Sequence, residues 1–126
     1  MGQGPAVLVA DDEPLLRRLM VRVLESDGLQ VVAVENGDDA VRACADAAAG
    51  IVVVVLDVTM PGGGAEALDR VLQARPELGI VLTSGAAPEA ALRERLKAAG
   101  GRFLQKPFAP DALRRAVRES LPGGAL

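Results

Sequence analysis

Histidine, tryptophan and tyrosine are absent from this 126-residue chain, which has a single cysteine and only two phenylalanines. Without histidine, the protein cannot hold a Ser-His-Asp triad, a histidine metal site or a phosphohistidine of its own. The lone Cys44 excludes an internal disulfide and a cysteine metal cluster, and its small neighbours favour a core position. With so few aromatic side chains, the core must consist of Val, Leu, Ile and Ala.

Basic blocks and long apolar runs are also missing. Fourteen Lys and Arg against seventeen Asp and Glu give a net charge of −3, without a basic block that could track a phosphate backbone. The longest apolar run, residues 51–56, is far shorter than the ~20 residues of a membrane helix, and no signal segment opens the chain. We therefore expect a cytoplasmic protein that binds neither nucleic acid nor membrane.

Short apolar runs rich in Val and Ile predict parallel strands. The runs at residues 6–10, 51–56 and 80–83 are hydrophobic without alternation, which is typical of strands buried on both faces. Weaker runs cover residues 30–34 and 102–105. Between and after these runs, apolar residues recur at helical intervals and predict five helices. The first begins at Pro14 and stops at Gly28, and the others cover about residues 38–47, 65–74, 88–99 and 110–121. This alternation predicts an α/β fold with a parallel sheet and helices on both faces.

We predict one domain, residues 1–126, with a core of about residues 6–121. A chain of this length has room for one core of ordinary size. Residues 1–5 and 122–126 are expected to be flexible tails or the cut ends of linkers, and the sequence leaves both interpretations open. The pair Asn36-Gly37 supplies turn chemistry and a helix cap before the second helix.

Acidic, hydroxyl and basic side chains follow the predicted strands. Asp11 and Asp12 follow the first run, Asp57 follows residues 51–56, Ser84 follows the next and Lys106 the last. The carboxyl ends of parallel strands meet at one edge of a sheet, so these groups should converge. Clustered carboxylates repel one another and require a cation, for which Mg²⁺ is suited. Each residue alone would be an ordinary cap, turn or surface group, but together they suit an aspartate that accepts a phosphoryl group.

Four segments, LVADDEP, VLDVTMPG, VLTSGAAPE and FLQKPF, occur in this order along the chain. On these segments, over about residues 7–121, the chain resembles the receiver domain of two-component response regulators and hybrid histidine kinases. The resemblance implies a flavodoxin-like (βα)5 fold, with a doubly wound five-stranded sheet in the order 2-1-3-4-5. FLQKPFAPDAL is more similar to receivers attached to hybrid kinases than to those attached to transcription factors.

The resemblance also implies a phosphorylation site and a metal site. Asp57 would carry the phosphoryl group. Mg²⁺, with Mn²⁺ as an alternative, would be held by Asp12, Asp57 and the main-chain carbonyl of Thr59, while Asp11 would act partly through water. Residue 59 also lies where variation tunes dephosphorylation.

Other roles follow from the same resemblance. Lys106 would pair with a phosphoryl oxygen and Ser84 would swing to bond another, a movement that the ring of Phe103 would follow. Gly85 would leave room for the phosphoryl group. The Lys106-Pro107 peptide bond would be cis, an isomer that an X-Pro bond can adopt.

The resemblance implies partners and an output. The donor would be phosphohistidine on a histidine kinase or phosphotransfer protein, docked over the first helix and the loop with Pro107 and Phe108. The face formed by the fourth helix, the fifth strand and the fifth helix would change, and it could support a weak homodimer of an otherwise monomeric protein. Such a domain is no enzyme in the usual sense, because it catalyses only its own phosphorylation and dephosphorylation.

One loop departs from the family pattern. Gly62-Gly63-Gly64-Ala65 stands where the family usually has an Asp-Gly or similar pair. Three consecutive glycines predict a pliable loop, which leaves the kinase preference and the lifetime of the phosphorylated form open.

Three other functions would account for part of this sequence pattern. A phosphatase of the haloacid dehalogenase type needs a second acid two residues beyond its nucleophile, where this chain has Thr59. A dinucleotide-binding domain needs GxGxxG after the first strand, where ADDEP stands. A receiver-like interaction module that is never phosphorylated remains, and the full set of acidic, hydroxyl and lysine residues argues against it.

Overall fold

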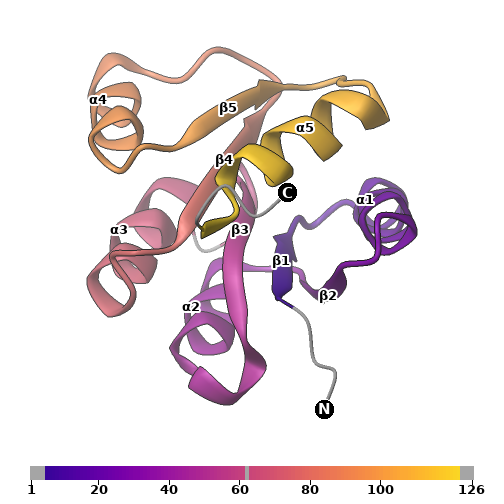
Figure 1. Ribbon diagram of the computed structural model, residues 1–126. Coiled ribbons are helices and arrows are strands. Elements are labelled where there is room, and N and C mark those ends of the chain that lie inside the picture. The colour runs from indigo at the N-terminus through magenta and orange to yellow at the C-terminus, as the bar shows by residue number, and fades with distance from the viewer. Residues whose placement is uncertain (1–4, 62, 123–126) are drawn as a thin grey trace.

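The computed structural model describes residues 5–61 and 63–122, which form one five-stranded parallel sheet in the order β2-β1-β3-β4-β5 (Figure 1). The strands are β1 (Ala6–Ala10), β2 (Gln30–Val34), β3 (Ile51–Asp57), β4 (Gly79–Ser84) and β5 (Arg102–Gln105). The helices are α1 (Pro14–Ser26), α2 (Gly37–Ala45), α3 (Gly64–Ala74), α4 (Ala90–Ala98) and α5 (Pro110–Ser120), with a short 3-10 turn η1 (Ala47–Ala49). The predicted fold class, strand order and strand positions are confirmed. The predicted tails lie outside the described residues except for Pro5 and Pro122.

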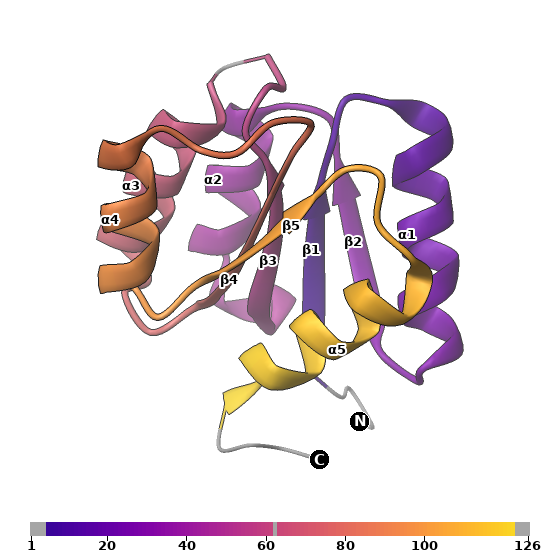
Figure 2. The same ribbon diagram turned by 90° about the horizontal axis from the view of Figure 1, so that it is seen from above.

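The helices cover both faces of the sheet, as the alternation of strands and helices predicts. Helices α1 and α5 lie on one face, and α2, α3 and α4 lie on the other (Figure 2). Each face has its own aliphatic core: Val9, Val55 and Val81 lie beneath α1 and α5, whereas Leu56 and Leu82 lie on the opposite side. The sheet is therefore doubly wound around two layers of packed side chains.

Burial along the strands explains their sequence pattern. Every residue of β1 is buried, and β3 is buried except for the half-exposed Val52. The edge strands β2 and β5 have only half-buried and exposed residues. A continuous apolar run therefore corresponds to a central strand covered by helices on both sides. Cys44 is also fully buried, in the core under α2.

The ends of the helices follow local capping chemistry. Pro14 is the first residue of α1, and Gly28, with a φ of 84°, follows its end. The side chain of Asn36 accepts a hydrogen bond from the Asp39 N–H at 2.8 Å, so the predicted cap of α2 is confirmed.

Two helix boundaries differ from the prediction by two residues, and the other differences are of one residue. Helix α2 ends at Ala45 rather than at residue 47, because Asp46 is extended and its side chain accepts from the Ala48 N–H at 3.0 Å to open the separate turn η1. Helix α4 begins at Ala90 rather than at residue 88, because Glu89 is still extended, with a ψ of 157°. No helix among the described residues has the length and apolar character needed to cross a bilayer.

Candidate functional site

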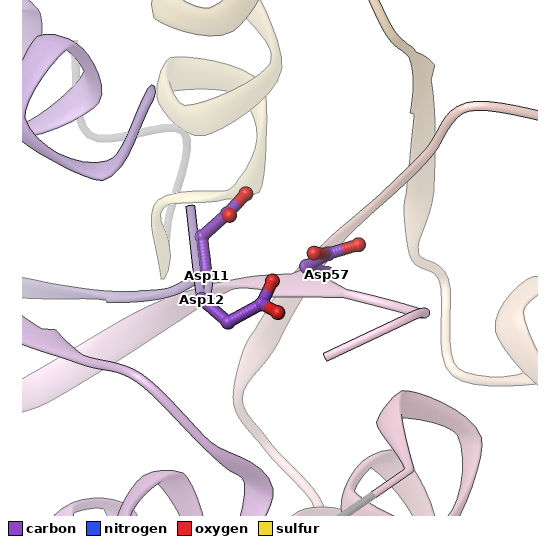
Figure 3. Close-up of side chains that lie close together, drawn as sticks. All are labelled: Asp11, Asp12 and Asp57. Atoms are coloured by element: carbon purple, nitrogen blue, oxygen red, sulfur yellow. The ribbon is translucent and has the colours of Figure 1, made fainter. Parts of the chain in front are cut away.

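Three carboxylates gather beyond the carboxyl ends of β1 and β3 (Figure 3). Asp11 and Asp12 directly follow β1, and Asp57 is the last residue of β3 rather than the first after it. One oxygen from each lies within 4.8 Å of the others. Asp11 and Asp57 are 0% and 1% exposed, whereas Asp12 is exposed. The structure thus brings the three predicted acidic residues together.

The carboxylate of Asp57 is held in place from two sides. Its Oδ1 accepts hydrogen bonds from the Thr59 N–H and from the Thr59 Oγ1–H, both at 3.1 Å. Its Oδ2 lies 3.3 Å from the Lys106 Nζ. One oxygen is therefore oriented by the loop that follows β3, and the other faces an ammonium.

Lys106 reaches this cluster from the opposite part of the sheet. Its Nζ lies 3.0 Å from the Asp11 Oδ2, its side chain is only 19% exposed, and its N–H donates to the Ser84 carbonyl at 2.7 Å. The Lys106-Pro107 peptide bond is cis, as the resemblance implies. Burial acts to lower the pKa of Lys106, but the contacts with Asp11 and then with Asp57 outweigh it, so the pKa is raised above its ordinary value.

Asp11 is only partly satisfied by its neighbours. Its Oδ1 accepts from the Glu13 N–H at 2.9 Å, and its main-chain carbonyl accepts from the Arg17 Nη1 at 2.8 Å. Its buried Oδ2 accepts no well-directed hydrogen bond within the described residues, although the Lys106 Nζ is 3.0 Å away. The two atoms are close enough for a hydrogen bond but are not aligned for one, so the attraction between them is Coulombic. A buried carboxylate oxygen of this kind is costly to leave without a partner.

These residues fit a divalent cation. The donor set consists of carboxylate oxygens, which suit hard ions such as Mg²⁺ or Mn²⁺ rather than soft ones. The unsatisfied Asp11 Oδ2 and the mutual repulsion of three carboxylates both favour added positive charge. The part of the Thr59 carbonyl in metal binding stays a prediction.

The residues of the expected switch, Ser84 and Phe103, lie on the neighbouring strands β4 and β5. Ser84 is the last residue of β4 and nearly buried, and its Oγ accepts from the Ala86 N–H at 3.2 Å rather than contacting Asp57. Phe103 is half-buried and packs against the core on the α2, α3 and α4 side. A Cβ at Gly85 would meet no described atom within 4 Å, so space remains there.

Sequence reasoning missed the role of Gly64. Rather than belonging to a pliable loop, Gly64 is the buried first residue of α3, and its N–H donates to the Val58 carbonyl at 2.9 Å. A Cβ there would lie 2.4 Å from the Asp57 carbonyl oxygen. A glycine run gives no signal of such a close approach, because it depends on where α3 meets β3. Gly63 has a φ of 75°, and Gly62 lies outside the described residues.

Comparison with known proteins decides the family. The family model described as "response regulator receiver domain" matches residues 7–118. The chain belongs to this family. The receiver is 32% identical over 116 residues to the transcriptional regulatory protein AruR of Pseudomonas aeruginosa, a match that covers 90% of this chain and 48% of AruR. It is 28% identical over 118 residues to the chemotaxis protein CheY of Thermotoga maritima, covering 92% of this chain and 97% of that protein.

A solved structure agrees with these matches. The response regulator receiver protein from Sinorhizobium medicae superimposes on this receiver with a TM-score of 0.79 at 28% identity, covering 97% of this chain and 98% of that one. The receiver therefore spans nearly the whole of some relatives and about half the length of AruR. Its membership of a two-component signalling family is clear from both sequence and fold.

Proposed function

We propose that this receiver takes a phosphoryl group from a phosphohistidine donor onto Asp57 in a reaction that depends on Mg²⁺. The observation that supports this most is the position of the Asp57 carboxylate, between the two hydrogen bonds from Thr59 and the Lys106 ammonium 3.3 Å away. Its catalysis is confined to its own phosphorylation and dephosphorylation, so it acts as a switch rather than as an enzyme on outside substrates.

The chemistry requires little from the protein beyond positioning and charge. A carboxylate oxygen of Asp57 forms the new O–P bond while the N–P bond of the donor breaks, and the imidazole leaves with the electron pair of that bond. Lys106 neutralises charge on a phosphoryl oxygen, since its ammonium already lies within 3.3 Å of the accepting carboxylate. A Mg²⁺ held by Asp12, Asp57 and the Thr59 carbonyl, with Asp11 acting partly through water, would supply further neutralisation of the phosphoryl charge. Water later hydrolyses the acyl phosphate and resets the switch.

The response to phosphorylation involves Ser84 and Phe103. The Ser84 hydroxyl accepts a hydrogen bond from the Ala86 N–H, and its own O–H is the donor that would turn toward a phosphoryl oxygen on Asp57. Phe103 lies one strand away, opposite Leu82 in the ladder, and its ring is only partly buried against the core. We propose that phosphorylation favours a state in which both side chains have moved inward and thereby alters the face formed by α4, β5 and α5, the same face that would form a weak homodimer of an otherwise monomeric receiver.

The donor protein would dock beside the site. Leu15 and Leu19 of α1 are 75% and 51% exposed, which is unusual for large apolar side chains. A cavity of about 420 Å³ lies next to them, and it is lined by Glu13, Leu16, Leu19, Lys106, Pro107 and Phe108. An apolar surface at the mouth of a phosphorylation site suits a helix that presents phosphohistidine, which this chain itself lacks. The partner would be a histidine kinase or phosphotransfer protein in the cytoplasm, and attachment to a hybrid kinase fits the sequence of the last segment.

Mass spectrometry after incubation with acetyl phosphate and Mg²⁺ tests the proposal. One added phosphoryl group is expected on the wild-type protein and none on Asp57→Asn. Asp69→Asn is the matched control, because it removes a carboxylate on α3 that is 43% exposed and pairs with Arg95. A wild-type protein that gains no phosphoryl mass would instead indicate a receiver-like interaction module. Turnover of a generic phosphate ester would favour a phosphatase.

A further inference from the structure

Two buried side-chain oxygens have no hydrogen-bond partner within residues 5–61 and 63–122, namely the Asp11 Oδ2 and the Thr83 Oγ1. The first belongs to the acidic cluster described above. The second is on a side chain that is 0% exposed and to which no role has been assigned. A buried hydroxyl without a partner is destabilising, so its surroundings require an explanation.

The Thr83 side chain lies on the same face of the sheet as the acidic cluster. Side chains alternate along a strand, so Thr83 points to the same side as Val81, which packs beneath α1 and α5. By the same alternation, Asp57 follows Val55 to this side. Thr83 and Asp57 are also direct neighbours in the β3-β4 ladder.

The path of the Lys106 side chain crosses this position. Lys106 follows β5, yet its Nζ lies 3.3 Å from the Asp57 Oδ2 on β3 and 3.0 Å from the Asp11 Oδ2 beyond β1. Strand β4 lies between β5 and β3, so the lysine must pass over the end of β4 to reach these carboxylates. Thr83 is the residue of β4 that faces this side at the level of Asp57. The Thr83 side chain is therefore on the face of the sheet that the lysine crosses.

We infer that Thr83 is a positioning residue for Lys106. An ammonium has three N–H donors, and the contacts of the Lys106 Nζ with the two carboxylates, at 3.0 and 3.3 Å, are ion pairs that leave a donor for a further acceptor. In the inferred arrangement one N–H of Lys106 donates to the unpartnered Thr83 Oγ1 while the ammonium stays beside Asp57. The hydroxyl thereby fixes the distance of the Lys106 ammonium from the sheet. The consequence for phosphoryl transfer rests on the proposed function, whereas the hydrogen bond itself does not.

Two substitutions separate the hydroxyl from the packing of Thr83. Thr83→Val keeps the shape and removes the hydroxyl, whereas Thr83→Ser keeps the hydroxyl and removes a methyl group. If Thr83 positions Lys106, labelling by acetyl phosphate should slow roughly tenfold in Thr83→Val, the size expected for loss of a hydrogen bond to a charged group. Thr83→Ser should stay within about twofold of the wild type, because it still has the acceptor. The urea midpoint should fall in Thr83→Ser, which leaves a small cavity, and fall less or not at all in Thr83→Val.

A merely structural role would give the opposite pattern. Labelling would then follow stability, so that Thr83→Ser would be the slower variant and Thr83→Val would resemble the wild type. That result would overturn the inference.

A second measurement does not depend on phosphorylation. Lys97 and Lys106 are the only lysines of the chain, so protein labelled with isotopic lysine gives two resolvable side-chain signals by NMR. Thr83→Val should shift the Lys106 signal and leave that of the exposed Lys97 unchanged, and Thr83→Ser should restore it. An unshifted Lys106 signal in Thr83→Val would overturn the inference even if Asp57 is phosphorylated. If the wild type takes no phosphoryl group, the proposed function fails, and the NMR result still decides the role of Thr83.

Discussion

The replacement Gly64→Ala tests the contact that joins α3 to β3, the strand that carries Asp57. A Cβ at residue 64 would lie 2.4 Å from the Asp57 carbonyl oxygen, 2.4 Å from the Val58 Cα and 2.6 Å from the Val58 carbonyl oxygen. All three are main-chain atoms, so no side-chain rotation can relieve the overlap. The first turn of α3 must move away from the end of β3 instead.

The expected cost follows from two opposing effects. Alanine is favoured over glycine within a helix by about 1 kcal/mol. Overpacking a closely packed site costs about 1–3 kcal/mol, and contacts with rigid backbone belong at the upper end of this range. We therefore expect a net loss of about 1–2 kcal/mol in the free energy of unfolding, or a fall in Tm of about 3–10 °C for a domain of this size.

Urea denaturation followed by circular dichroism measures this loss, with Gly85→Ala as the control. A Cβ at Gly85 would meet no described atom within 4 Å, so that variant should unfold at the wild-type midpoint or slightly above it. If Gly64 were only a pliable position, alanine would stabilise the protein by restricting the unfolded chain. A Gly64→Ala protein as stable as the wild type, or more stable, would therefore refute the close-approach argument.

Three further predictions concern charge and burial. Mg²⁺ at one hundred times its Kd should stabilise the wild-type receiver by about 2.7 kcal/mol in urea denaturation and stabilise Asp12→Asn much less, whereas a wild type indifferent to Mg²⁺ would contradict the metal site. Because the pKa of Lys106 is raised in the folded state, its stabilising effect should be complete below the ordinary lysine pKa of about 10.4 and lost as pH rises through the higher folded value. The difference in urea midpoint between wild type and Lys106→Met should therefore be constant from pH 8 to about 10 and shrink above that. A difference that grows with pH would mean that folding lowers the pKa of Lys106 and would contradict this prediction. Burial, opposed weakly by Arg75, raises the pKa of Cys44 to about 11, so a thiol reagent at pH 8 should modify it only after unfolding, and rapid modification of the native protein would contradict this.

The strands could be predicted from the sequence because a strand that is buried on both faces is apolar at nearly every position. The runs that became β1 and β3 are apolar at nearly every position, and both are central strands beneath helices on each side. The site could be predicted as a set for a related reason. Asp11, Asp57 and Ser84 stand where parallel strands end, and parallel strands end at one edge.

What could not be predicted depends on distances between elements. The overlap at Gly64 requires the position of α3 relative to β3, and the glycine run around it suggested freedom rather than constraint. Similarly, the sequence shows Thr83 only as a residue of a buried strand. Its relation to Lys106 follows from the strand order, which places β4 between β5 and β3. Such relations involve two or three segments at once, and no local pattern in any one of them indicates where the others lie.

The strand order itself links the stability of the site to its reactivity. Because β3 lies between β1 and β4, the Asp57 carboxylate is flanked by the Asp11 carboxylate on one side and approached by Lys106 across β4 on the other. One ammonium therefore serves two buried carboxylates, and the Asp11 Oδ2 is left without a well-directed hydrogen bond. The resting site is short of positive charge before any phosphoryl group arrives. A cation that relieves this shortage would stabilise the folded receiver and, by the same charge, would favour the phosphoryl transfer to Asp57 that we propose.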